Sequence, residues 1–382
     1  MENSQAATLA ILAPYPFVPA KSGGHKAVSA YVRYISAARP TICICSEGNA
    51  ALPGVELIPL FPDHPSKYFD PRVGWRIRRV LRQRKIKYLG LQHHYHGLLL
   101  MPFLWGLGIK TFVFSHNIEF ERWRSMDRWW WPLMKGTEQL VYYWAKAVFF
   151  ISWHEAQRAP KLFRLAPEKC YYAPYPIDQS TSPPYEDALR QTINDRYGFA
   201  KDEKLLLFFG PQSYLPNLEA VKHIVYRIHP LLKVISPFQY RILICGGGLP
   251  DRYERFADLA EEGVHYLGFV EDIETYVQAA DIILNPVNIG GGVKTKLVEA
   301  IAMGKTVVSS KTGALGVQAA SFGSKLIQVK DTKWEAQAEA IVAAMEDALQ
   351  PTPASFYEEH YGPRAVQPIL SWLSKMEDLY YA

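Results

Sequence analysis

The sequence contains no long apolar run. Although 49% of its 382 residues are hydrophobic, no apolar stretch reaches the roughly 18–20 residues of a membrane-spanning helix. Its start, MENSQAATLAILAP, has no basic segment before the apolar one and leads into a predicted strand, unlike a signal peptide. These absences argue against a membrane span and a secretory leader, so we expect a cytoplasmic protein.

Cysteine is scarce, and metal-ligand patterns are missing. The four cysteines (Cys43, Cys45, Cys170 and Cys245) have no zinc-site spacing and are interpreted as reduced core thiols. His93, His94 and His96 follow a predicted strand without a neighbouring carboxylate, and we interpret them as cleft-lining or structural residues. No Asp-x-Asp pair follows a strand near the glycine turns. We therefore predict no metal site and no bound cofactor.

Two other binding signatures are absent. Gly246–Gly248 follows a predicted strand but lacks the G-x-G-x-x-G spacing and the later acidic residue of a dinucleotide site, which argues against NAD. No recognised nucleic-acid-binding module accompanies the basic residues, so nucleic acid is not an expected partner.

The most informative stretch runs from Asp281 to Gly304, DIILNPVNIGGGVKTKLVEAIAMG. Ile282–Leu284 predicts a buried parallel strand, three glycines then open a helical pattern, and Gly304 closes it before another strand. Ligands of open α/β sheets bind at the carboxyl ends of such strands. Free N–H groups at a helix start favour an anion such as phosphate.

Lys296 and Glu299 fall on one face of this predicted helix. One interpretation is a surface ion pair that contributes about 0.2–0.5 kcal/mol. The other is a nucleotide clamp, in which the ammonium contacts a phosphate and the carboxylate accepts from both ribose hydroxyls. Spacing alone favours the ion pair.

The run GGGVKTKLVEAIAMGKTVV resembles the signature of retaining, nucleotide-sugar-dependent glycosyltransferases of family four, also called group 1. Supporting stretches, in the same order as in that family, are SGGHKAV at 22–28, FSHNIEFERW at 114–123, FFGPQSYLPNLEAV at 208–221, ILICGGG at 242–248 and YLGFVEDIETYVQAADIILNP at 266–286. The resemblance covers nearly the whole chain and is specific for the family but not for the substrate.

The resemblance implies an α/β GT-B fold, with two doubly wound Rossmann-like domains facing each other across a cleft. We expect an amino-terminal acceptor-side domain over 1–174 and a nucleotide-sugar-binding domain over 185–350, joined by a Pro-rich linker. A final helix at 354–382 is expected to pack back on the first domain.

The resemblance also implies the site residues. His116 faces the donor sugar and phosphate, and Lys296 stabilises the departing diphosphate; we assign both as catalytic. The predicted donor site comprises Gly23, Gly24, Gly210, Gly268, Phe269, Val270, Gly290, Gly291, Gly292, Lys294 and Glu299. Within it, the glycines allow close approach of the diphosphate, residues 268–270 contact the base, and Lys294 reaches the site only if the first helical turn is open.

Two positions depart from the family pattern. Most members carry two glutamates in this stretch; Glu299 matches the second, but Gly291 occupies the position of the first, which normally addresses the sugar. The segment GPQSYLPN also lacks the basic pair that members often place there for the diphosphate. Recognition of the donor sugar must therefore differ, and Lys296 is expected to supply the missing charge.

Charge is distributed unevenly along the chain. Residues 1–180 hold 23 Lys/Arg against 12 Asp/Glu, about +11, and the remainder holds 19 against 25, about −6. The cationic predicted helix at 74–89 and the tryptophans of the helical region at 118–146 favour peripheral contact with the acidic inner face of a membrane. A solvated outer helix with tryptophans as core filler is the alternative.

We therefore predict a metal-independent hexosyltransferase. It would move a sugar from a UDP- or GDP-linked donor to a glycan or lipid-linked acceptor with retention, in polysaccharide or glycoconjugate biosynthesis. A non-catalytic nucleotide-sugar-binding subunit and a GT-B nucleotide-sugar epimerase are the alternatives.

Overall fold

The computed structural model describes residues 8–20, 22–251, 253, 259–346 and 350–381. It divides the chain into two compact units. The first comprises Met1–Asp178, Gly291–Val293 and His360–Ala382, and the second comprises Gln179–Gly290 and Lys294–Glu359. The ends of the chain included in the predicted ranges, residues 1–7 and 382, lie outside the described residues.

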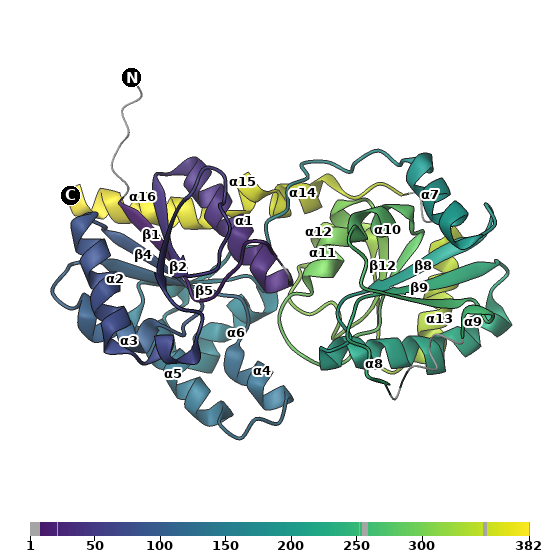
Figure 1. Ribbon diagram of the computed structural model, residues 1–382, viewed down its shortest axis with the longest axis horizontal. Helices are drawn as coiled ribbons and strands as arrows, with labels where there is room; N and C mark the ends of the chain where they lie inside the picture. Colours follow the sequence, from purple (N-terminus) through teal and green to yellow (C-terminus); the bar gives the residue numbers. More distant parts are fainter. Residues whose placement is uncertain (1–7, 21, 252, 254–258, 347–349, 382) are drawn as a thin grey trace. The chain divides into compact units, whose positions relative to one another are not determined.

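The first unit is built on a seven-stranded parallel sheet with the order β3-β2-β1-β4-β5-β6-β7 (Figure 1). Its strands are β1 (Leu9–Ala13), β2 (Thr41–Ser46), β3 (Glu56–Phe61), β4 (Tyr88–Gln92), β5 (Lys110–Ser115), β6 (Ala147–Phe150) and β7 (Cys170–Tyr172). The central strands are apolar and buried because helices cover both faces of the sheet. The strand order reverses between β1 and β4, which is where ligands of such sheets bind.

The helices of the first unit start where the sequence supplies caps. Ser22 Oγ accepts from the backbone N–H of His25 at the start of the first helix, and Asp70 caps the second ahead of Pro71. The helices are α1 (Gly23–Ala38), α2 (Pro71–Gln83), α3 (Gly97–Leu104), α4 (Glu119–Ser125), α5 (Trp131–Trp144) and α6 (Trp153–Phe163). The predicted helical region at 118–146 is therefore two helices, and Asp127 between them has a positive φ of 52°.

The second unit contains a six-stranded parallel sheet with the order β10-β9-β8-β11-β12-β13. Its strands are β8 (Lys204–Phe209), β9 (Tyr240–Cys245), β10 (Val264–Gly268), β11 (Ile282–Asn285), β12 (Thr306–Ser310) and β13 (Leu326–Val329). Its helices include α7 (Asp187–Tyr197), α8 (Leu215–His223), α9 (His229–Ile235), α10 (Ile273–Ala279), α11 (Thr295–Ala302), α12 (Ala319–Phe322) and α13 (Trp334–Glu346). Here the order reverses between β8 and β11.

The carboxy-terminal segment differs from the single predicted helix at 354–382. It forms α14 (Ala354–His360), α15 (Gly362–Ala365) and α16 (Gln367–Tyr381). Helix α14 belongs almost entirely to the second unit, where the Tyr357 hydroxyl donates to the Ala302 carbonyl at 3.0 Å. Only α15 and α16 belong to the first unit. Pro363 and Pro368 lie in the first turns of these two helices, where proline is tolerated, and divide the segment.

We expect Trp372→Ala to destabilise the first unit. The indole is 4% exposed, and its ring centroid lies 5.2 Å from that of Phe112 and 6.0 Å from that of Phe149. Truncating a buried Trp typically costs about 3–5 kcal/mol. The urea-unfolding transition of the first unit, followed by circular dichroism, should have its midpoint at a lower urea concentration. The neighbouring exposed Ser371→Ala is the control, and equal midpoints for the two variants would contradict the packing.

Candidate functional site

A half-buried lysine lies at the strand-order reversal of the second unit. Lys296 projects from α11 to the carboxyl end of β8. Its ammonium donates to the Phe209 carbonyl and to Asn217 Oδ1, both at 3.1 Å, and lies 3.9 Å from the centre of the Phe208 ring. This arrangement does not match a surface ion pair.

The surroundings of Lys296 disfavour its charge. Burial, and secondarily the positive charge of Lys294, lower the pKa of the ammonium to about 7. Its hydrogen-bond partners are dipoles rather than carboxylates, so the protein compensates the charge only in part. An anion that reached this ammonium would raise the pKa again and hold the lysine protonated.

The turn after β8 leaves room for this contact only because residue 210 is glycine. Gly210 has a φ of +133°, and a Cβ there would lie 2.8 Å from Asn217 Nδ2. That amide in turn donates to the Pro211 carbonyl at 2.9 Å, which orients Oδ1 toward Lys296. Sequence reasoning identified Gly210 and Lys296 but missed Asn217, because its spacing from Lys296 gives no signal.

The glycine turn lies beside the same strand end, but the helix begins later than predicted. Helix α11 starts at Thr295 with Lys294 as its N-cap residue, so Gly290, Gly291 and Gly292 form a loop before it. Gly290 has a φ of +92°, and a Cβ there would lie 3.5 Å from Pro216 in the first turn of α8. By contrast, a Cβ at Gly291 would meet no heavy atom within 4 Å.

Glu299 lies one turn after Lys296 on α11 and is half-buried. Gly268, Phe269 and Val270 lie at the end of β10, two strands from β8. The Gly268 carbonyl accepts from the Gly246 N–H at 2.6 Å, and the Phe269 side chain is 78% exposed. Neighbouring strands lie about 4.8 Å apart, so the ends of β8 and β10 are separated by about 10 Å.

In the first unit, His116 lies just past the end of β5 and is buried. Its Nε2 is 2.6 Å from Gln92 Oε1, and its ring stacks on that of His93 with centroids 4.3 Å apart. Burial, and secondarily His93, hold the pKa of His116 well below its usual 6.5. A neutral imidazole can hydrogen-bond a sugar but cannot act as a cation toward phosphate.

Gly23 and Gly24 are the first two residues of α1, and two side chains connect Gly24 to His116. A Cβ on Gly24 would lie 3.8 Å from the Tyr15 hydroxyl, and that hydroxyl lies 2.9 Å from His93 Nε2. His93 then stacks on His116. The structure thus brings the start of α1, with Gly23 and Gly24, to the same strand ends as His116 and adds Tyr15 to the candidate residues.

The three histidines after β4 have different surroundings. His93 belongs to the stack with His116, whereas His94 Nε2 lies 3.1 Å from Met134 Sδ. His96 packs against Phe61 and Tyr68. Burial lowers the pKa of His93 and His96 to about 3 and that of His94 to about 4, so all three are neutral near pH 7.

A buried glutamate holds the segment that carries His116. Glu138 of α5 is fully buried, and its two carboxyl oxygens accept from the backbone N–H groups of Glu119 (3.0 Å) and Phe120 (3.2 Å). The Tyr142 hydroxyl lies 2.8 Å from both Glu138 Oε1 and Ser115 Oγ. Burial raises the pKa of Glu138 to about 8. Sequence reasoning missed this residue because no motif marks it.

Comparison with known families identifies the class of protein. Residues 23–181 match the family model described as Glycosyltransferase Family 4, and residues 203–347 match the model described as Glycosyl transferases group 1. The chain therefore belongs to the family 4, or group 1, glycosyltransferases, a retaining family that transfers sugar from a nucleotide sugar. None of the curated proteins matches the chain.

Solved structures share the GT-B fold. Anabaena HepE in complex with UDP is similar with a TM-score of 0.70 and 16% identity, over 96% of this chain and 100% of the other. Sucrose-phosphate synthase of Thermosynechococcus elongatus is similar with a TM-score of 0.70 and 15% identity, over 98% of both chains. WaaG, a glycosyltransferase involved in lipopolysaccharide biosynthesis, is similar with a TM-score of 0.62 and 15% identity, over 94% of this chain and 95% of the other. The predicted fold class is confirmed.

We expect Glu138→Gln to change how stability depends on pH. Because burial raises the folded pKa to about 8, the folded state binds more protons than the unfolded state between pH 4.5 and 8, and stability falls as pH rises through this window. The uncharged glutamine removes this fall but leaves one backbone N–H without its acceptor, at a cost of about 1–3 kcal/mol.

The destabilisation by Glu138→Gln should therefore be large at pH 5 and shrink toward pH 8, measured by urea unfolding. Exposed Glu47→Gln is the matched control. A pH-independent difference between the variant and the wild type would show that Glu138 is charged throughout.

Proposed function

We propose that this chain is a metal-independent hexosyltransferase that uses a UDP- or GDP-linked sugar, with Lys296 holding the donor diphosphate. The observation that carries the proposal is the Lys296 ammonium at the end of β8, which donates to the Phe209 carbonyl and to Asn217 Oδ1 beside the Gly290 turn. A diphosphate would supply the charge that these dipoles lack.

The remaining roles follow from the positions of the side chains. Glu299 would accept from the ribose hydroxyls, and the backbone of residues 268–270 would contact the base. The N–H groups at the start of α11, including that of Lys294, would face the phosphates together with Gly290–Gly292. Gly210 would keep the turn open for Asn217. Neutral His116 would orient the sugar by hydrogen bonding, and Gly23 and Gly24 at the start of α1 would allow close approach of the diphosphate.

The comparisons support a hexose donor and a glycan acceptor. HepE structures are in complex with UDP and with UDP-glucose, and WaaB is a lipopolysaccharide outer core galactosyltransferase. We therefore propose a glycan or lipid-linked acceptor and a role in polysaccharide or glycoconjugate biosynthesis. Transfer with retention would use the departing diphosphate to take the acceptor proton, while Lys296 stabilises its developing charge.

Gly291 supports a second candidate, a non-catalytic nucleotide-sugar-binding subunit. The residue that addresses the sugar in most members is replaced here by a glycine without a side chain. Such a subunit would bind the donor without consuming it. Turnover of a donor sugar without any acceptor would instead indicate an epimerase.

Titration calorimetry tests the proposed site. Binding of UDP or GDP at pH 8, where free Lys296 is mostly neutral, should take up about one proton, seen by comparing buffers of different ionisation enthalpy. Lys296→Met should abolish this proton uptake. It should also weaken binding of the nucleoside diphosphate but not binding of the nucleoside. Glu299→Gln should weaken binding of both the nucleoside and the nucleoside diphosphate by about 1.5–3 kcal/mol, the range for a hydrogen bond to a charged group.

Exposed Lys233→Gln is the control for charge alone. Unchanged affinities and unchanged proton uptake in the Lys296 and Glu299 variants would place the nucleotide elsewhere. Tight binding without transfer to any acceptor would favour the non-catalytic subunit.

We further propose a cytoplasmic protein with peripheral contact at an acidic membrane surface, made by the first unit. Helix α2 buries Val73, Ile77 and Leu81 but leaves Trp75 63% exposed beside exposed arginines, and Trp129 is 84% exposed. Within the described part of the chain, no helix has the length and apolarity to cross a bilayer.

The protein should sediment with vesicles that contain phosphatidylglycerol at low salt and much less at high salt, because each basic residue near the surface contributes about 1 kcal/mol. Arg76→Gln with Arg79→Gln should weaken sedimentation, and Trp129→Ala should weaken it independently of salt. If the wild type stays in the supernatant at both salt concentrations, the basic face is merely solvated.

A further inference from the structure

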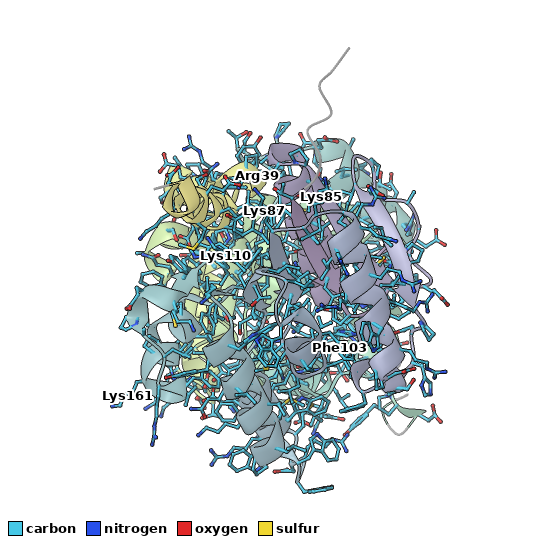
Figure 2. The ribbon with its side chains drawn as sticks, turned by 90° about the vertical axis from the view of Figure 1, so that its left-hand side faces the viewer. Arg39, Lys85, Lys87, Phe103, Lys110 and Lys161 are labelled. Atoms are coloured by element: carbon cyan, nitrogen blue, oxygen red, sulfur yellow. The ribbon has the colours of Figure 1, made fainter. Side chains whose placement is uncertain are left out.

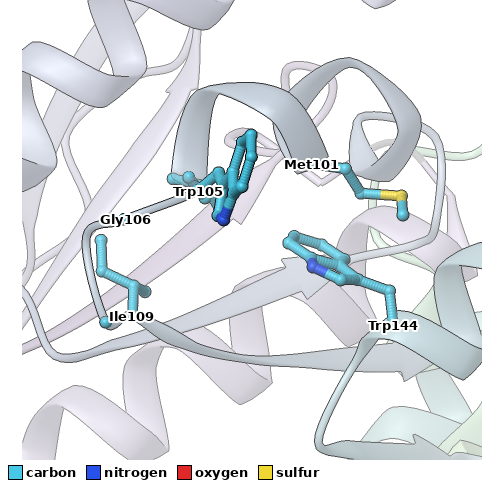
Figure 3. A pocket seen from close by; sticks show the side chains of 7 residues that line it. Met101, Trp105, Gly106, Ile109 and Trp144 are labelled. Carbon is cyan, nitrogen blue, oxygen red and sulfur yellow. The ribbon is translucent and has the colours of Figure 1, made fainter.

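The first unit has a pocket that the proposed transfer does not use. It has a volume of about 390 Å³ and is lined by the end of α3, by Trp105, Gly106, Gly108 and Ile109, and by Trp144 of α5. Figure 3 shows the Trp105 indole with Ile109 to its left and with Trp144 and Met101 to its right. The Trp105 side chain is 86% exposed.

The pocket lies far from the candidate catalytic residues of this unit. Ile109 directly precedes β5, whereas His116 follows the carboxyl end of the same strand. A six-residue strand spans about 20 Å at roughly 3.3 Å per residue. The pocket is therefore at the opposite edge of the sheet, and a ligand in it does not touch His116.

The wall of the pocket combines aromatic faces with exposed backbone. Gly106 and Gly108 have φ angles of +75° and +66°, and a Cβ on either would meet nothing within 4 Å. Their peptide groups thus border open space, and each indole adds one N–H donor. A ligand suited to this wall presents a flat apolar face together with hydroxyl groups. A sugar ring does so, whereas an acyl chain would desolvate the peptide groups without replacing their hydrogen bonds.

The charge around the pocket favours an acidic ligand. Residues 71–118 contain nine Lys/Arg and no Asp or Glu, and most of the pocket wall comes from this stretch. Arg78 donates to the Trp105 carbonyl at 3.3 Å, and exposed Lys146 follows Trp144 by two residues. Figure 2 shows Lys85, Lys87 and Lys110 together at this end of the unit.

We propose that this pocket binds a saccharide unit of an acidic glycan, separately from sugar transfer. Stacking between Trp105 and Trp144 would hold the ring, the peptide groups at Gly106 and Gly108 would pair with its hydroxyls, and the surrounding cations would attract its carboxylate or phosphate groups. Such a site would retain a growing acidic polymer on the protein between transfers.

The test measures binding alone, so its result does not depend on the proposed transferase activity. The full-length protein is titrated by calorimetry with an oligogalacturonate hexamer and with maltohexaose, at low and high salt. The acidic hexamer should bind more tightly than the neutral one, and high salt should remove the difference. Trp105→Ala should weaken binding by about tenfold or more, since aromatic anchors dominate such contacts.

Two variants make the result specific. Trp144→Phe keeps an aromatic ring but loses the N–H donor, so it should weaken binding less than Trp105→Ala. Trp129→Ala removes an equally exposed indole outside the pocket and should leave binding unchanged.

Three outcomes would overturn the proposal. These are no binding of either hexamer, binding that Trp105→Ala does not change, and equal binding of the acidic and neutral hexamers at low salt. Sedimentation with phosphatidylglycerol vesicles that depends on Trp105, without oligosaccharide binding, would assign the pocket to the membrane surface instead.

Discussion

The arrangement of the second unit depends on the burial of one ammonium group. Lys296 could extend into solvent, yet it points to the end of β8, where the Phe209 carbonyl, Asn217 Oδ1 and the Phe208 ring surround its Nζ. Desolvating a lysine is unfavourable, and the lowering of its pKa to about 7 reflects that cost. The fold maintains the unfavourable position because Gly210 admits Asn217 and because α11 places residue 296 over the strand end.

The first unit also buries an ionisable group, here an acid whose raised pKa of about 8 keeps it largely uncharged near pH 7. Glu138 is buried beneath the segment that follows β5, where it accepts backbone N–H groups from Glu119 and Phe120. These donors belong to the start of α4, which lies directly after His116 and Asn117. A buried carboxyl thus fixes a backbone turn, and that turn positions a neutral histidine. In both units, an ionisable group without a full counter-charge is found at the strand ends where ligands of such folds bind.

The sequence predicted the fold well because its signals were regular. Buried apolar strands, glycine turns and helix caps recur along the chain, and the family resemblance ordered them into two sheets. Boundaries that depend on tertiary packing were less predictable: α11 begins at Thr295 rather than in the glycine run, and the expected helix at 354–382 is three helices. Of the candidate site, the glycines, His116 and Lys296 carry local signals, whereas Asn217 and Glu138 act through contacts between residues 79 and 19 positions apart.

The replacement at Gly291 bears on what the site can discriminate. A larger residue would fit there, since a Cβ meets no heavy atom within 4 Å, and glycine is therefore not required by packing. Lys296 and Glu299 are independent of that position, because both project from the regular part of α11. Position 291 can therefore be varied without disturbing the contacts of Lys296 with the Phe209 carbonyl and Asn217 Oδ1 at the end of β8.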